Sequence, residues 1–134
     1  MRLIKAFLDS DVIISSLLSS TGAAYLLTRQ KSAVKYISNL SVKEIHIVAR
    51  RLAINSSIVD KLLRRFKLVR LKKDFGKDYV NDPHDQHVIS GAVTAKARFL
   101  LTYNLKHFKV EKIKRDFNIL VYQPAQFLQY LRSL

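Results

Sequence analysis

Hydrophobic runs of strand length alternate along this chain with stretches whose apolar residues recur every three or four positions. Strand-like runs occupy residues 3–8, 34–37, 68–71, 99–102 and 119–122. Helical patterns lie between the first four of these runs, and a last one follows Pro124, which suits the first position of a helix. Strands that alternate with helices predict an α/β fold, here a three-layer α/β/α sandwich with a central, mostly parallel sheet.

Capping residues mark several of the predicted helix starts. Ser10 or Asp11 is placed to cap a helix over residues 12–18, and Ser20-Thr21 is placed to open the next one. Ser41, with Glu44 three residues later, is typical of a capping box. Capping alone therefore accounts for several of the polar residues beside the apolar runs.

The stretch DPHDQHVISGAVTAKARFLL, residues 82–101, combines a helix start, a helix and a strand. Asp82 before Pro83 is typical of an N-cap, which puts Asp85 at the third helical position, where the helix dipole favours a carboxylate. Asp85 also lies one turn before Val88 and Ile89, so it shares the apolar side of this helix. Its position is compatible with a buried role.

Acidic residues and one amide are predicted to converge at one edge of the sheet. Asp9 follows the first strand, Glu44 is expected in the first turn after the second, and Asn104 follows the strand at 99–102. In a parallel sheet these strand ends and the start of the helix at Asp85 share the carboxyl edge. Clustered carboxylates repel one another unless cations neutralise them, and oxygen ligands favour Mg²⁺ or Mn²⁺.

The net charge of +14, from 24 Lys and Arg against 10 Asp and Glu, predicts a polyanionic partner such as RNA. Basic residues concentrate at 61–73 and 106–115, although around Arg64 and Arg65 the pattern also suits the solvated side of an amphipathic helix. The candidate RNA-binding residues are Arg64, Arg65, Lys67, Lys72, Lys73 and Lys106.

Composition limits the other possibilities. With 134 residues, one domain over residues 1–134 is expected. The absence of cysteine excludes disulfides and thiolate metal sites and fits the cytoplasm, and no apolar run is long enough to span a membrane. The sequence Asp74-Phe75-Gly76 is interpreted as a turn. His84 and His87 are not interpreted as zinc ligands, and His46 and His107 are isolated in the sequence.

Four signatures, in order, resemble those of the PIN domain family of small metal-dependent nucleases. They are LDSDVIISSLL at the first strand end, YISNLSVKEIHIVARRL with its Glu, DPHDQHVISGAVTAKARFLL with its Asp, and LTYNLKHF. The closing ILVYQPAQFLQYL is also similar to the family's usual ending. The resemblance covers nearly the whole chain.

The resemblance implies a site and an activity. Asp9, Glu44 and Asp85 match the family's metal-binding acids, and Asn104 completes the catalytic set at a position where Asp is commoner. The auxiliary candidates are Asp11, Asp82 and Thr102, the last as a hydrogen-bond donor to a ligand carboxylate. The implied activity is Mg²⁺- or Mn²⁺-dependent hydrolysis of RNA by an endoribonuclease.

Small members of this family are commonly toxins of the VapC type, which are held inactive by an antitoxin protein and are often dimeric. Two alternatives remain at the level of the sequence. Asn104 raises the first, a catalytically weak PIN-like module that only binds RNA. The charge raises the second, a small DNA-binding regulator whose adjacent helices at 41–55 and 57–66 would bind the duplex.

Overall fold

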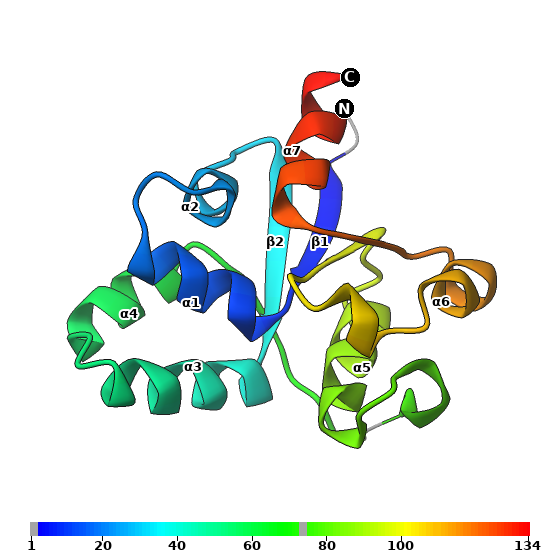
Figure 1. Cartoon of the computed structure of the whole chain (residues 1–134), viewed down its shortest axis with the longest axis horizontal. Helices are drawn as coiled ribbons and strands as arrows, with labels where there is room; N and C mark the ends of the chain where they lie inside the picture. The colour runs from blue at the N-terminus through cyan, green and yellow to red at the C-terminus, as the bar shows by residue number, and fades with distance from the viewer. Residues whose placement is uncertain (1–2, 73–74) are drawn as a thin grey trace.

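A five-stranded parallel sheet forms the centre of the molecule in the computed structural model, which describes residues 3–72 and 75–134 (Figure 1). The strands are β1 (Ile4–Leu8), β2 (Ala33–Ser38), β3 (Lys67–Val69), β4 (Phe99–Leu101) and β5 (Leu120–Tyr122). Their order is β3-β2-β1-β4-β5, and every pairing is parallel. The first strand therefore lies in the middle, between the second and the fourth.

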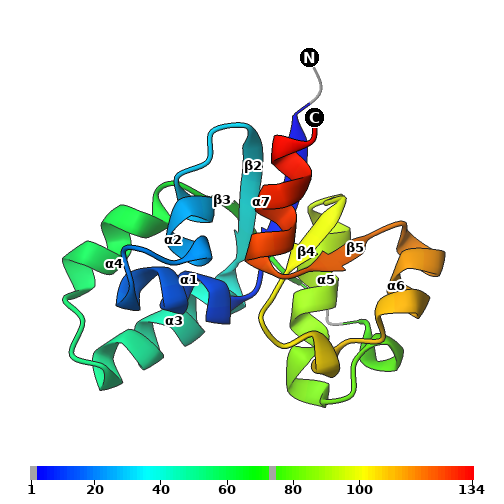
Figure 2. The same cartoon turned by 45° about the horizontal axis from the view of Figure 1, so that its top comes forward.

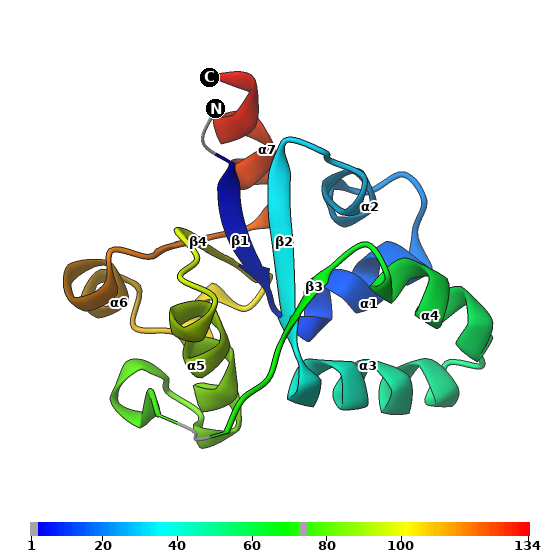
Figure 3. The same ribbon diagram turned by 180° about the vertical axis from the view of Figure 1, so that it is seen from behind.

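Helices cover both faces of the sheet, which confirms the predicted three-layer sandwich. The first face packs against α1 (Ser10–Leu18), α2 (Ala23–Thr28), α3 (Asn39–Arg51), α4 (Ser56–Leu63) and α7 (Pro124–Arg132). The second face packs against α5 (Gln86–Thr94) and α6 (Val110–Phe117). Three short 3₁₀ turns, η1 (Lys77–Tyr79), η2 (Pro83–Asp85) and η3 (Leu105–His107), complete the described elements. Figure 3 shows the sheet from behind, with α5 and α6 on one side of β1 and α1 to α4 on the other.

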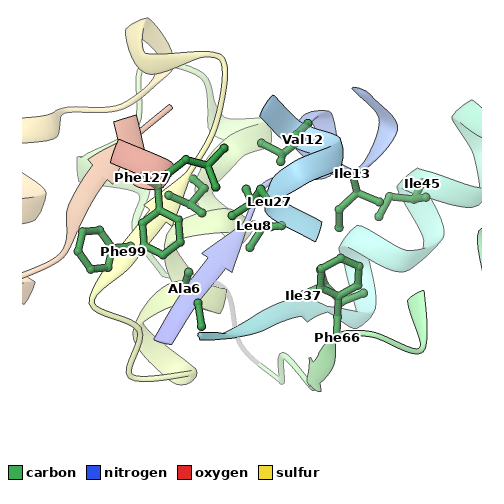
Figure 4. Close-up of a cluster of buried hydrophobic side chains, with 14 of the residues drawn as sticks. Ala6, Leu8, Val12, Ile13, Leu27, Ile37, Ile45, Phe66, Phe99 and Phe127 are labelled. Atoms are coloured by element: carbon green, nitrogen blue, oxygen red, sulfur yellow. The ribbon is translucent and has the colours of Figure 1, made fainter. Parts of the chain in front are cut away.

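Alternation along β1 supplies both hydrophobic layers. Ala6 and Leu8 belong to the cluster under α1, α2 and α7, whereas Phe7 belongs to the cluster under α5. Figure 4 shows the first cluster, where Leu8 lies among side chains from the helices and Phe99 and Phe127 approach edge to face with ring centroids 5.0 Å apart. Burial on both faces explains why the last three residues of β1 and all of β4 are apolar.

Two of the predicted helix starts are wrong. The helix α1 begins at Ser10, after Asp9 as its N-cap, and neither Ser10 nor Asp11 caps it. The next helix, α2, begins only at Ala23, with Gly22 as the N-cap, so Ser20-Thr21 lies before it.

The predicted capping box at Ser41 is also wrong. Ser38 at the end of β2 caps α3, and its side chain accepts a hydrogen bond of 3.0 Å from the Ser41 backbone N–H. Ser41 is therefore already inside the helix, and Glu44 lies in its second turn, free of any capping role. Ser38 is buried, ends β2 and caps the helix that follows. The sequence therefore shows no change from apolar to polar residues at this helix start.

Other predictions hold with shifted bounds. The strand expected at 68–71 is β3, and the capping role of Asp82 is confirmed, since its side chain accepts from the His84 backbone N–H at 3.0 Å. Asp74, in the sequence interpreted as a turn, lies outside the described residues. In the part of the chain that the structure covers, no helix has the length and apolarity to cross a membrane.

Candidate functional site

The carboxyl edge of the sheet brings together the polar residues predicted to converge there. Asp9 leaves β1 at this edge, and its backbone N–H donates to the Leu101 carbonyl at 2.9 Å, which ties it to the end of the neighbouring β4. The helix α3 begins at the same edge and α5 approaches it, as Figure 2 shows. Because β1 and β4 are neighbours in the sheet, Asp9 and Thr102 lie side by side although they are 93 positions apart in the sequence.

Thr102 connects the acids of β1 to the end of β4. Its buried hydroxyl lies 3.0 Å from Asp9 Oδ2 and 3.4 Å from Asp11 Oδ2, so it can donate its one proton to either carboxylate. The same oxygen accepts a 3.0 Å hydrogen bond from the Asn104 backbone N–H. The predicted contact between Thr102 and a candidate ligand carboxylate is therefore present in the structure.

Asp11 has a structural role that its predicted capping function did not anticipate. Its Oδ2 accepts from the Tyr103 backbone N–H at 3.0 Å and from Asn104 Nδ2 at 3.1 Å. Because Asn104 donates through its amide nitrogen, an Asp at this position would face Asp11 with a second negative charge. Among the described residues, Asp11 Oδ1 is buried without a hydrogen-bond partner.

Burial and charge together make Asp9 hard to ionise. The pKa of Asp9 rises from 3.8 to about 7, chiefly because the carboxyl is buried, and then because the charges of Asp11, Asp85 and Glu44 repel it; the Thr102 hydrogen bond opposes this rise. Burial also raises the pKa of Asp11 and of Asp85. The charges of Asp11, Glu44 and Asp85 therefore all act on Asp9.

Glu44 is stabilised as an anion from two sides. Its carboxylate accepts a hydrogen bond from Ser10 Oγ, and its Oε2 lies 3.6 Å from His87 Nε2. The contact with His87 is the main reason that the pKa of Glu44 is lowered, and the hydrogen bond from Ser10 adds to the effect. Ser10 and His87 thus link α1, α3 and α5 through this one side chain.

Asp85 ends η2 at the start of α5 and faces a second histidine. His107 Nδ1, in η3, lies 3.1 Å from Asp85 Oδ2. The charge of His107 lowers the pKa of Asp85, but the burial of the carboxyl outweighs it, so the pKa stays raised. Asp82 is exposed and caps η2, and its charge acts on Asp85 in the direction that raises the pKa.

The two histidines beside the acids were missed by sequence reasoning, which rejected His87 as a zinc ligand and regarded His107 as isolated. Both follow a predicted site residue closely: His87 comes two positions after Asp85, and His107 comes three after Asn104. That spacing did not predict the contacts, because each histidine pairs with an acid from another element: His87 with Glu44 and His107 with Asp85. Each histidine is placed against a carboxylate of the site, whereas His46 pairs with Asp60 elsewhere, at 3.2 Å.

The oxygen atoms of the acidic residues suit a divalent cation chemically, but they are not arranged around a single point. Oxygen ligands, mutual repulsion of the acids and the unpartnered Asp11 Oδ1 all favour a bound cation. In the described ranges, however, no three His, Asp or Glu side chains converge on one point that could hold a metal ion. Ser10 and His87 engage Glu44, and His107 engages Asp85, so a cation here would exchange places with these partners.

The candidate RNA-binding residues are divided among separate parts of the surface. Arg65 and Lys67 line one pocket, and Arg64 lines another beside His46 and Asp60. Lys106 lies in η3 next to His107, beside the acids. Lys72 is exposed, and Lys73 lies outside the described residues.

The comparisons with known proteins agree with this fold. The PIN domain family model matches residues 5–106, which include all the predicted site residues, and the chain therefore belongs to the PIN domain family. No curated protein sequence matches the chain. Among solved structures, a chain of VapBC2 from Rickettsia felis, bound to a DNA fragment from their promoter, is similar with a TM-score of 0.63 at 17% identity. That match covers 90% of this chain and 98% of the other, and at this identity it shows a shared fold.

Proposed function

We propose that this protein is a metal-dependent ribonuclease that hydrolyses RNA phosphodiester bonds. One observation carries the proposal: the buried carboxylate of Asp9 is held by Thr102 and repelled by Asp11, Glu44 and Asp85 at the carboxyl edge of the sheet. Burying carboxylates together is costly unless a cation neutralises them. Membership of the PIN domain family supports a nuclease at this edge.

The protein's own residues position the acids for this role. Thr102 holds Asp9, and the Tyr103 backbone and the Asn104 amide hold Asp11, so the turn after β4 fixes both carboxylates of the β1 end. Glu44 and Asp85, which approach from α3 and η2, supply two further oxygen donors. These four acids are the proposed ligands of Mg²⁺ or Mn²⁺, with Asn104 as a neutral neighbour that limits the negative charge.

A bound divalent cation lowers the pKa of a coordinated water and stabilises charge on the scissile phosphate. No serine or cysteine nucleophile is then needed. Lys106, the residue before His107 in η3, is assigned the role of attracting the phosphate backbone toward the acids.

The proposal extends to a toxin of a toxin–antitoxin pair, with an antitoxin protein as its partner and the cytoplasm as its place of action. The likeness to VapBC2 of Rickettsia felis, a complex bound to promoter DNA, supports an antitoxin partner and a homodimer. The adjacent helices α3 and α4 fall within the part matched by the family model and pack in the layer over the sheet, which favours this role over a separate DNA-binding regulator.

Asn104 motivates one competing function, an RNA-binding module with little or no catalysis. In the structure its amide is engaged with Asp11, so it adds no charge to the acidic cluster. The two functions differ in one measurable property, which is cleavage that depends on a divalent metal.

The decisive experiment follows a labelled single-stranded RNA with Mn²⁺, with Mg²⁺ and with EDTA. Wild type is expected to cut with metal only, and Asp85→Asn is expected to lose cleavage by at least about 100-fold, beyond the 10–100-fold typical of a residue that only orients a metal ligand. Asp82→Asn is the matched control, because Asn is an equally good N-cap and the variant removes a neighbouring charge outside the proposed ligand set.

Two outcomes would contradict the ribonuclease proposal. Cleavage that persists in EDTA would remove the metal from the mechanism. Equal RNA binding by wild type and Asp85→Asn, with no cutting under any condition, would favour the binding module.

A further inference from the structure

Five cationic side chains surround a pocket that lies apart from the acidic cluster. The pocket has a volume of about 350 Å³ and opens between the end of α2, the start of β2 and the start of β3. Its basic lining residues are Arg29, Lys31, Lys35, Arg65 and Lys67, and no Asp or Glu is among the residues that line it. None of these residues belongs to the site at the carboxyl edge of the sheet.

Lys35 forms the buried wall of this pocket. It lies on β2 and is only 6% exposed, yet it carries an amino group. That group donates to the Thr28 carbonyl at 3.2 Å, to the Gln30 carbonyl and, at 3.5 Å, to the Leu27 carbonyl. The carbonyls at the end of α2 thus hold the Lys35 amino group and fix one positive charge in place.

The other four cations are exposed and have no acidic counterpart. Of the described Lys and Arg residues, only Arg115, on the far helix α6, forms an ion pair with a carboxylate. The positive charge of Arg65 acts on Lys35, since it helps burial to lower the pKa of Lys35 to about 8. Arg29 is held over the Tyr25 ring at 4.1 Å, so its position is also restrained. The cations repel one another, and a bound anion would relieve that repulsion.

The lining distinguishes between kinds of anionic partner. Ala33 and Val34 are the only apolar residues in it, and neither is an exposed large side chain. A protein segment would need apolar anchors to bind here, whereas a phosphate group needs only cations and polar donors. The pocket opens at the start of β2, whereas the acidic cluster lies beyond its last residue, Ser38, so about 20 Å of strand separates them. An RNA strand of several nucleotides is needed to contact both.

We propose that this pocket is a second phosphate-binding site, which holds the RNA backbone away from the point of cleavage. The inference rests on the proposed function in taking RNA as the ligand. It assigns Arg65 and Lys67, together with Arg29, Lys31 and Lys35, to a site that anchors the strand and takes no part in catalysis. Free phosphate is the alternative source of the same chemistry.

The test measures the salt dependence of RNA binding in EDTA, where no cleavage occurs. Fluorescence anisotropy gives the dissociation constant of a labelled single-stranded RNA for the full chain over a range of NaCl concentrations. The double variant Arg65→Gln/Lys67→Gln should bind more weakly, and its log–log salt slope should shrink by about 1.4, since each phosphate contact to a single strand contributes about 0.7. Lys31→Gln alone should shrink the slope by about 0.7.

The control is Lys96→Gln/Arg132→Gln, which removes two exposed cations, one after α5 and one in α7, outside this pocket and outside both basic segments. It should keep the wild-type slope. Equal losses in the pocket variants and the control would overturn the proposal, because they would show only a response to net charge. Unchanged melting temperatures would show that the substituted, exposed positions leave the fold intact.

Two further measurements distinguish RNA from free phosphate as the ligand and test whether an acidic peptide binds instead. If inorganic phosphate raises the melting temperature of wild type but not of Arg65→Gln/Lys67→Gln, free phosphate is enough to occupy the pocket. If only RNA raises it, the pocket binds the RNA backbone. Wild-type RNA binding by the double variant, with loss of binding to polyglutamate, would make this a peptide site and would overturn the proposal. Because cleavage is not measured, a protein that never cuts can still pass this test.

Discussion

At the scale of single residues, Asp9 is the side chain on which the candidate site depends. It is buried, it is hydrogen-bonded to Thr102, and its pKa is raised to about 7. A carboxyl whose pKa is higher in the folded than in the unfolded state favours folding when it is protonated. Its contribution is fully present below pH 4 and is lost as the pH rises through about 7.

Asp9→Asn should therefore stabilise the metal-free protein at pH 8, by on the order of 2–4 kcal/mol, and change little at pH 4. Urea unfolding in EDTA at the two pH values measures this difference. In Mn²⁺ at pH 8 wild type should be the more stable of the two proteins, because the Asn amide replaces a charged metal ligand. A control, exposed Asp78→Asn, should show neither effect; an Asp9→Asn variant less stable than wild type at pH 8 in EDTA would contradict the prediction.

The identity of the acids could be predicted from the sequence, but their partners could not. Asp9 and Asp85 stand out because each meets an apolar run at an element boundary. The contacts of Glu44 with Ser10 and His87 join three helices, and that of His107 with Asp85 joins two short turns. Such contacts depend on how the helices pack, which periodicity along one element does not report.

At the scale of elements, strand positions were more predictable than helix starts. Buried parallel strands are continuous apolar runs, whereas a cap depends on which polar residue reaches a backbone N–H. The helix α6 was missed altogether, because its segment was interpreted as a basic cluster. Ile113 is fully buried and Phe117 packs against the same cluster, four residues on, so the apolar face of this helix is narrow and surrounded by charge.

The close contact between α5 and β1 leaves no room for a side chain at Gly91 of α5. A Cβ at Gly91 would lie 2.3 Å from Phe7 Cζ, and Phe7 is fully buried. Gly91→Ala should therefore destabilise the protein by about 1–3 kcal/mol through overpacking. Chemical denaturation measures the loss.

Gly22→Ala is the matched control, since the nearest atom to its new Cβ is Ser19 Oγ at 3.8 Å. Its cost should stay below about 1 kcal/mol, the loss of a modest N-cap. Phe7→Leu should recover part of the stability of Gly91→Ala by making room. Equal stability of the two alanine variants would show that α5 moves away from the sheet without cost.

At the scale of the whole molecule, the positive charge is largely uncompensated. The net charge is +14, and within the described ranges a single Lys or Arg pairs with a carboxylate. Screening should relieve this self-repulsion, so the melting temperature should rise by a few degrees as NaCl increases from about 0.1 M to about 0.5 M. Scanning calorimetry in EDTA checks this, and a constant or falling melting temperature would show that the charges are spaced too widely to matter.

The strand order also determines at what point of synthesis the acidic residues at the carboxyl edge of the sheet can come together. The central β1 is synthesised early, but its partner β4 and the hydroxyl of Thr102 follow Asp9 by 93 residues. At about 5–20 residues per second, the ribosome needs about 5–20 s to supply them. During that interval the nascent chain holds Asp9 without the neighbour that fixes it. If the proposed ribonuclease activity is correct, the messenger that is being translated meets an incomplete site until β4 and the turn after it have been made.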